Sequence, residues 1–302
     1  MTDTSATIAV LMPGDMGHAV GRALGEHGHR VVTCLTGRSD HSRTLAAAGN
    51  LEDLGSLELV VAEADMVLSI LPPASAPGLA RDVAAAMQAA DARPIYVDCN
   101  AIAPETAKGV AETITDAGAA FIDAGIIGLA PGKGGATRFY VSGTDTGPMQ
   151  TLDGKGIQVL ALGPHAGQAS AIKMCYAALT KGTWTLQLAL LMAAERYGLY
   201  DDLISEFAFS QSATLKTMEG GRLPRIPADA ARWVGEMEEI AQSFRDVGVP
   251  GGFHEGAAEV FRTLAQTPFA AETRETWDAS RTLAEAIPVY AQYLDAGDGE
   301  PN

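Results

Sequence analysis

Short apolar runs alternate with helical patterns along the first half of the chain, from Thr7 to about Gly163. Gly, Pro, Asp or Asn marks each boundary, which is typical of repeated strand–helix units. Several runs are apolar almost throughout, as expected for strands that helices cover on both faces of a sheet. The predicted strands are 7–11, 30–35, 66–71, 95–98, 120–124, 139–142 and 158–161. Together they indicate a parallel sheet.

After Gly163 the strand signals stop and helical periodicity takes over. The predicted helices are 167–197, 202–209, 228–247, 255–265 and 272–294. Residues 186–194 are apolar on almost every helical face, so protein should surround them, either as a core helix or at a dimer interface. We therefore predict an α/β fold: a doubly wound Rossmann-type parallel sheet over residues 1–163, followed by an all-α domain over residues 164–302.

Composition narrows the class of protein. Of the 302 residues, 47% are hydrophobic and 19% charged, and 21 Lys and Arg against 37 Asp and Glu give a net charge of −16. Such an acidic chain repels a phosphate backbone, so we expect no nucleic-acid partner. The longest apolar stretch falls short of the ~20 residues that a membrane span needs, so we expect no membrane partner either.

We expect a cytoplasmic protein. The chain begins with Met1-Thr2-Asp3-Thr4-Ser5, which lacks the basic segment and apolar stretch of a secretory signal. Its three cysteines, Cys34, Cys99 and Cys175, are widely spaced in apolar runs, which is typical of reduced thiols.

The first predicted strand leads into Met12-Pro13-Gly14-Asp15-Met16-Gly17 and then into an Ala- and Leu-rich helix. In a strand–turn–helix unit, glycines let the backbone approach a pyrophosphate, and the helix N-terminus supplies amide donors. Gly14 and Gly17 hold the second and third positions of G-x-G-x-x-G, while Met12 occupies the first. We expect a dinucleotide to bind at residues 13–17.

The end of the second strand distinguishes NAD from NADP. An acidic residue there would bind the ribose 2′-hydroxyl, but the sequence offers Thr36-Gly37-Arg38-Ser39. The Arg38 guanidinium and the Ser39 hydroxyl suit a phosphate monoester, so NADP is favoured and NAD is possible. The alternative is that Arg38 is a solvated surface residue.

Two further strand ends should face the same crevice. Leu71 and Pro72 follow the third strand, and Asn100 follows the fourth. Asn100 is a candidate for contact with the nicotinamide or its ribose. It could equally cap the helix that Pro104 begins.

The segment from Asp123 to Arg138 is too rich in glycine to be a core strand and could wrap a small ligand. We assign substrate binding to Ile127-Gly128-Leu129 and to Lys133. Lys133 and Arg138 could attract an anionic substrate, although both could also be solvated loop charges. The segment is not a phosphate-binding P-loop, because Gly134 stands where Ser or Thr should follow Lys133.

The long helix carries a polar row. Lys173, Tyr176 and Thr180 share one face at the i, i+3 and i+7 positions of an otherwise apolar helix. A lysine beside a nicotinamide can donate a proton to a carbonyl oxygen as the hydride arrives, and burial would bring its pKa toward the working range. The alternative is a surface lysine that extends to solvent.

These motifs resemble the β-hydroxyacid dehydrogenase superfamily, in its 6-phosphogluconate-dehydrogenase-like branch with a helical C-terminal domain. The resemblance covers the whole chain and rests on four segments: Gly14-Asp15-Met16-Gly17, Leu71-Pro72, Asp123-Ala124 with its glycine-rich loop, and Gly163 to Lys173. It implies that Lys173 is the catalytic acid and base. It also implies a substrate between the two domains and a homodimer built largely through the helical domain.

Three departures from the family leave the substrate open. Ile127-Gly128-Leu129 stands where the family commonly has Ser-Gly-Gly. Ala177 replaces the asparagine four residues after the lysine, and a second lysine expected before Gly248 falls at Gly235 or an acidic neighbour. These departures remove hydrogen-bond donors that the family has in its substrate loop and helix. Tyr176 or Thr180 is a candidate to replace them.

The sequence thus predicts an NADP-dependent oxidoreductase that transfers a hydride between the nicotinamide and a small hydroxy acid or related alcohol/carbonyl pair. A second hypothesis is imine reduction on the same fold, and a third is a non-catalytic NADP-binding sensor. The six histidines show no ligand spacing with Cys or acidic residues, so we expect no metal.

Overall fold

The computed structural model describes residues 5–273 and 276–294. The chain divides into two compact units, Met1–Tyr176 and Ala177–Asn302. The division falls inside the long helix α7 (Gln168–Arg196), later than the predicted boundary after residue 163. The reason is that the first turns of α7 pack against the sheet, as the contacts of Asp123 and Gly125 described below demonstrate.

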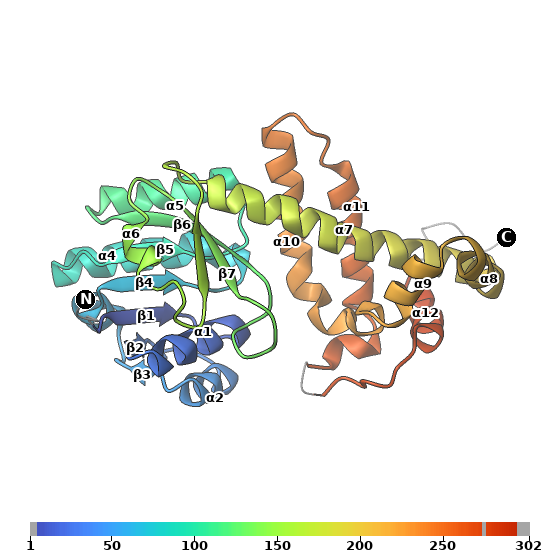
Figure 1. Cartoon of the computed structure of the whole chain (residues 1–302), viewed down its shortest axis with the longest axis horizontal. Coiled ribbons are helices and arrows are strands. Elements are labelled where there is room, and N and C mark those ends of the chain that lie inside the picture. Colours follow the sequence, from blue (N-terminus) through green and yellow to red (C-terminus); the bar gives the residue numbers. More distant parts are fainter. Residues whose placement is uncertain (1–4, 274–275, 295–302) are drawn as a thin grey trace. The chain divides into compact units, whose positions relative to one another are not determined.

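The first unit is an eight-stranded sheet with the order β3-β2-β1-β4-β5-β6-β7-β8 (Figure 1). Its strands are β1 (Thr7–Leu11), β2 (Arg30–Thr33), β3 (Glu52–Asp53), β4 (Met66–Ser69), β5 (Ile95–Asp98), β6 (Phe121–Ile127), β7 (Arg138–Ser142) and β8 (Gln158–Ala161). Its helices before α7 are α1 (Asp15–Glu26), α2 (Asp40–Ala48), α3 (Leu57–Glu63), α4 (Ala76–Ala90), α5 (Pro104–Asp116) and α6 (Gly147–Gln150). A short 3₁₀ turn, η1 (Pro73–Ser75), precedes α4.

Alternate residues of each central strand serve two separate apolar cores. Ile8 and Val10 of β1 belong to the core that contains Val20 and Leu24 of α1. Ala9 and Leu11 belong to the opposite core, with side chains from α3, α4 and α5. This double covering explains why the strands are apolar throughout.

The predicted Rossmann-type fold is confirmed, and two differences have simple causes. Strand β3 has only two residues, Glu52 and Asp53, and both are exposed. It therefore lacks the apolar run by which the other strands were predicted. Strand β7 is antiparallel to β6. Only residues 128–137 connect them, which is too short for the crossover that a parallel pair requires.

The second unit is helical. After α7 it contains α8 (Tyr200–Ser210), α9 (Ser212–Glu219), η2 (Leu223–Arg225), α10 (Pro227–Asp246), α11 (Gly252–Leu264), η3 (Pro268–Ala271) and α12 (Leu283–Gln292). Helix α9 was not predicted from the sequence. The predicted helix 272–294 is wrong over its first half, and its residues 274–275 lie outside the described part of the chain. The helix begins only at Leu283, because Thr282 and Glu285 form a capping box there.

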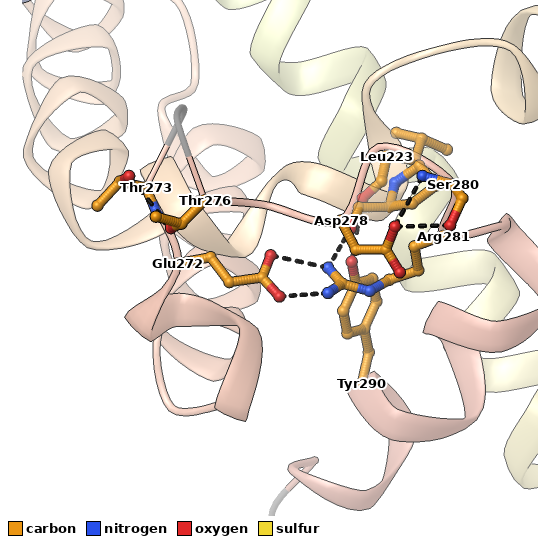
Figure 2. A network of polar contacts seen from close by, with 9 residues as sticks. Leu223, Glu272, Thr273, Thr276, Asp278, Ser280, Arg281 and Tyr290 are labelled. Carbon is orange, nitrogen blue, oxygen red and sulfur yellow. Dashed lines mark hydrogen bonds and ion pairs between the residues drawn. The ribbon is translucent and has the colours of Figure 1, made fainter.

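Two polar clusters hold the helical unit together. Lys181 and Glu236, both almost fully buried, form an ion pair at 2.7 Å beside Trp233, which packs against Trp184 and Phe261. The second cluster lies near the end of the chain (Figure 2). There, Arg281 binds the carboxylate of Glu272, and the hydroxyl of Tyr290 donates to the carbonyl of Leu223 at 3.2 Å. Across the described residues, none of the helices has both the length and the apolar character to cross a membrane.

Candidate active site

The turn between β1 and α1 contains two glycines, one tightly packed and one facing open space. A Cβ on Gly17 would lie 2.2 Å from the carbonyl oxygen of Met12, so only glycine lets α1 approach the end of β1 this closely. A Cβ on Gly14 would meet no heavy atom of the described residues within 4 Å, and Gly14 is exposed. Gly14 is the N-cap of α1, and as a glycine it has no side chain that could accept from the first amides of the helix. The N-cap residue therefore leaves the first backbone amides of α1 uncapped, which is the arrangement that favours anions at helix N-termini.

The loop after β2 contains the predicted 2′-phosphate residues. Arg38 is exposed, and the hydroxyl of Ser39 caps α2 by accepting from the amide of Ser42 at 3.2 Å. The hydroxyl of Thr36 donates to the carbonyl of Gly55. The sequence analysis missed Arg43, which donates to the carbonyl of Leu35 at 2.7 Å and so brings a second guanidinium to this loop.

A carboxylate also reaches this loop from β3. Oδ1 of Asp53 accepts from the amides of Leu35 and Gly55, each at 3.0 Å. Sequence reasoning missed Asp53, because only the pairing of the two-residue strand β3 with β2 brings it next to the end of β2.

Asn100 connects the ends of β4 and β5. Its Oδ1 accepts from the amide of Leu71 at 2.7 Å, and its Nδ2 donates to Ser69 and Asp98 at 2.9 and 3.0 Å. The alternative that Asn100 caps α5 is wrong, since Ala103 is the N-cap residue. Asn100 thus fixes the backbone of Leu71, while the next residue, Pro72, is exposed.

Asp98 is a buried carboxyl group at the end of β5. Its side chain is 0% exposed, and burial raises its pKa to about 7 even though the amide of Asn100 donates to Oδ1 at 2.9 Å. Asp98 pairs in register with Asp123 of β6, whose negative charge adds to the rise in the pKa of Asp98.

Asp123 binds the N-terminus of α7. Its Oδ2 accepts from the amides of Gly167, Ala169 and Ser170 at 2.8 to 3.0 Å. The hydroxyl of Ser170 donates to Oδ1 at 2.7 Å, and that of Ser142 donates to Oδ2 at 3.1 Å. Three amides and two hydroxyls therefore compensate a fully buried carboxylate and fix α7 over β6.

This contact determines where Lys173 lies. A Cβ on Gly125 would stand 2.9 Å from the Cβ of Lys173, so the glycine lets α7 pack closely on β6. The half-buried ammonium of Lys173 donates to the carbonyl of Ile126 at 2.8 Å. Ile126 lies beyond Asp123, the last residue of β6 that pairs with β5. Lys173 is thereby held at the carboxyl edge of the sheet, the edge where doubly wound folds bind ligands.

The other residues of the predicted row lie along the same helix. Tyr176 is 46% exposed, and it ends the first compact unit. Thr180 lies in the second unit, where its hydroxyl contacts the carbonyl of Ala177 at 3.2 Å.

The predicted substrate loop is the β6–β7 connection. Ile127 is buried as the last residue of β6, whereas Leu129 and Lys133 are exposed. Gly128 has a φ of 118°, and a Cβ there would lie 2.3 Å from the carbonyl oxygen of Ala136, so the turn requires glycine. Within residues 5–273 and 276–294, no cluster of three or more His, Cys, Asp or Glu side chains could hold a metal ion.

Two family models match separate parts of the chain. Residues 7–151 match the family model of the NAD binding domain of 6-phosphogluconate dehydrogenase, and residues 194–264 match a domain of unknown function, DUF1932. The predicted resemblance to hydroxyacid dehydrogenases of this type is confirmed. An uncharacterized 28.5 kDa protein of Methanothermus fervidus is 27% identical over 174 residues, which are 58% of this chain and 65%, less than two thirds, of that relative.

Three solved structures share the fold. A conserved protein described as structurally similar to 3-hydroxyacid dehydrogenases is 27% identical, with 86% of this chain and 98% of that one covered and a TM-score of 0.63. Mycobacterium tuberculosis 3-hydroxyisobutyrate dehydrogenase with L-serine is 20% identical, with 97% and 100% covered and a TM-score of 0.67. A Bacillus cereus imine reductase is 19% identical, with 88% and 96% covered and a TM-score of 0.53. The first unit thus matches an NAD binding domain, and the chain shares its fold with dehydrogenases and imine reductases.

Proposed function

We propose that this protein is an NADP-dependent oxidoreductase that acts on a small hydroxy acid or a related alcohol/carbonyl pair, with Lys173 as general acid and base. The observation that carries the proposal is the position of the Lys173 ammonium, 2.8 Å from the carbonyl of Ile126 at the carboxyl edge of a nicotinamide-binding sheet. A half-buried ammonium is stable only where hydrogen-bond acceptors compensate its lost hydration, and the carbonyl of Ile126 is one such acceptor.

The residues at the β1–α1 turn fit a dinucleotide. Gly14 leaves its surface open to close approach, and it is the N-cap of α1, so the N-terminal amides of the helix follow directly. Residues 13–17 would hold the pyrophosphate, and Leu71, Pro72 and Asn100 would flank the ring-bearing half. The nicotinamide, when bound, supplies or accepts the hydride.

Lys173 would manage the proton of the reaction. In reduction it donates a proton from Nζ to the substrate oxygen that acquires negative charge. In oxidation the neutral amine accepts the proton of the substrate hydroxyl. The carbonyl of Ile126 orients one N–H bond, while Asp123 holds the helix that carries the lysine.

The loop after β2 favours NADP over NAD. Arg38 is exposed, and Arg43 reaches the carbonyl of Leu35 in the same loop, so two guanidinium groups are available to a 2′-phosphate. The carboxylate that could bind a ribose hydroxyl, Asp53, already accepts from two backbone amides through Oδ1.

Two features support a homodimer in the cytoplasm. Helix α8 carries Leu203, Ile204 and Phe207, yet none of its residues is buried within the described chain, and Phe209 is 89% exposed. A second copy that covers this helix would remove the apolar surface from water. Cys34, Cys99 and Cys175 are free thiols, which suits a reducing compartment.

Imine reduction is the second candidate. Ile127 and Ala177 are both buried and apolar at positions where the family resemblance implies polar substrate contacts. The B. cereus imine reductase shares the fold. A site without these polar groups can accept an uncharged cyclic imine as well as a ketone.

A substrate screen separates the candidates. Purified protein would be assayed by absorbance of the reduced cofactor with hydroxy acids, ketones and cyclic imines, each with NADP(H) and NAD(H). Turnover of hydroxy acids or their keto acids with NADP(H) is expected. Turnover of imines alone would favour the second candidate, and tight cofactor binding without turnover would indicate a sensor.

A further inference from the structure

Arg138 shares a sheet face with the elements that hold Lys173. It is the first residue of β7 and pairs in register with Ile127 of β6. Side chains of directly paired residues point to the same face of a sheet. Residues 123, 125 and 127 therefore share a face with Ser142, Tyr140 and Arg138, their partners in the ladder. The contacts of Asp123 and Gly125 show that α7 packs on this face.

The register also limits the distance between Arg138 and Lys173. The Lys173 ammonium lies 2.8 Å from the carbonyl oxygen of Ile126, which immediately precedes Ile127. The Cα atoms of an antiparallel pair such as Ile127 and Arg138 are about 5 Å apart. The Cα of Arg138 thus lies on the order of 10 Å from the ammonium, and its long side chain can cover most of that distance.

Among the residues that the structure describes, the Arg138 side chain has no partner. Its Nε is buried and makes no hydrogen bond among the described residues, and no ion pair of Arg138 occurs there either. Arg281, by contrast, is neutralised by Glu272. A buried donor without a partner destabilises the folded protein, and the effect is greater when the donor is charged. An anion with two coplanar oxygens would satisfy Nε and a terminal nitrogen together.

We infer that Arg138 binds the carboxylate of the substrate on which Lys173 acts, an inference that rests on the proposed function. The substrate class is then a small carboxylic acid whose hydroxyl or carbonyl group lies one or two carbons from the carboxylate. Because Ile127, beside Arg138, offers no hydroxyl, the guanidinium supplies the anion contact that the substrate loop lacks. Arg138 is a binding and specificity residue, while Lys173 moves the proton.

A comparison of charged and neutral substrates tests the inference. Steady-state kinetics would be measured with 3-hydroxypropionate and with its neutral amide for wild type, Arg138→Gln, Arg138→Lys and the exposed control Arg81→Gln. In Arg138→Gln, KM for the acid should rise at least 30-fold, with kcat changed less than threefold and KM for NADP+ unchanged. KM for the amide should not change, and Arg138→Lys should recover part of the loss. Equal changes for acid and amide would overturn the inference.

A binding measurement separates this inference from the proposed function. Calorimetric titration of 3-hydroxypropionate, glycolate and L-serine into the protein saturated with NADP+ needs no turnover. Carboxylate binding that disappears in Arg138→Gln supports the inference even if no substrate is turned over, in which case the proposed function fails alone. Two results would overturn the inference if turnover depends on Lys173: carboxylate binding that is unchanged in Arg138→Gln, or no detectable carboxylate binding. In both cases the proposed function would still stand.

Discussion

The side chain of Asp123 and residue Ser170 are joined twice: Oδ1 accepts from the Ser170 hydroxyl at 2.7 Å, and Oδ2 accepts from its amide at 3.0 Å. Three residues further along each element, Lys173 meets the carbonyl of Ile126. The same register therefore links the buried carboxylate to the position of the ammonium. Asp123 acts as a positioning residue for Lys173.

Replacing Asp123 should damage stability and rate together. Asp123→Asn keeps one acceptor oxygen but removes the negative charge that strengthens the hydrogen bonds from three amides. We expect the free energy of unfolding in urea to fall by about 2 to 4 kcal/mol, and kcat to fall at least tenfold at temperatures where the variant stays folded. Ser170→Ala, which removes one hydroxyl, should cost only about 1 kcal/mol. Equal stability of wild type and Asp123→Asn would contradict this role.

The buried carboxyl group of Asp98 should make stability depend on pH. Its pKa is about 7 in the folded protein and about 3.9 in an unfolded chain. Because the folded state retains the proton to higher pH, the free energy of unfolding should decrease as pH rises from about 4 to about 7 and then level off.

The Asp98→Asn variant isolates this contribution. Asparagine is neutral at every pH, so the variant should lack the part of the slope that Asp98 contributes, on the order of a few kcal/mol across the window. Urea titrations of both proteins at pH 5, 6, 7 and 8 would measure the difference. Parallel stability curves for wild type and variant would refute the proposed titration of Asp98.

The two glycines of the β1–α1 turn should respond oppositely to alanine. Gly17→Ala places a Cβ 2.2 Å from the oxygen of Met12, so we expect a loss of stability of about 1 to 3 kcal/mol from overpacking. Gly14→Ala meets open space and should leave Tm nearly unchanged, yet weaken NADP binding at least tenfold. Thermal unfolding and fluorescence titration would measure the two effects. Full NADP affinity in Gly14→Ala would count against a dinucleotide at this turn.

Arg38 should discriminate between the two cofactors. Removing a guanidinium that binds a phosphate costs roughly 1.5 to 3 kcal/mol, so Arg38→Ala should weaken NADP binding by about 10- to 100-fold and leave NAD binding unchanged. Arg43→Ala should show a smaller loss with the same preference. The exposed Arg81→Ala is the control. Equal losses for NADP and NAD would exclude a 2′-phosphate contact.

The sequence predicts elements where one physical signal dominates. Apolar runs identified seven strands near their observed positions, and most residues are buried in all of these strands except β8. Strand β3 carried no such signal, since Glu52 and Asp53 are exposed. The first half of the predicted helix 272–294 failed because a local cap at Thr282 outweighed the periodicity.

The site residues also differ in how far the sequence alone predicts them. The Gly14–Gly17 turn and Lys173 follow from local spacing, which a sequence displays. Asp123 could not be assigned a role, because its partners at the start of α7 lie more than 40 residues away and become neighbours only when α7 packs on β6. Arg138 was visible as a loop charge, but its place beside Ile127 depends on the antiparallel register of β7.

The most direct test of the account is the kinetics of Lys173→Ala, compared with the exposed control Lys216→Ala. Loss of a general acid and base should lower kcat at least 100-fold while the affinity for NADP stays nearly intact, and the control should behave as wild type. Lys173→Arg keeps a positive charge but holds its proton too tightly, so it should be almost as slow. A Lys173→Ala enzyme with wild-type kcat would contradict the central claim.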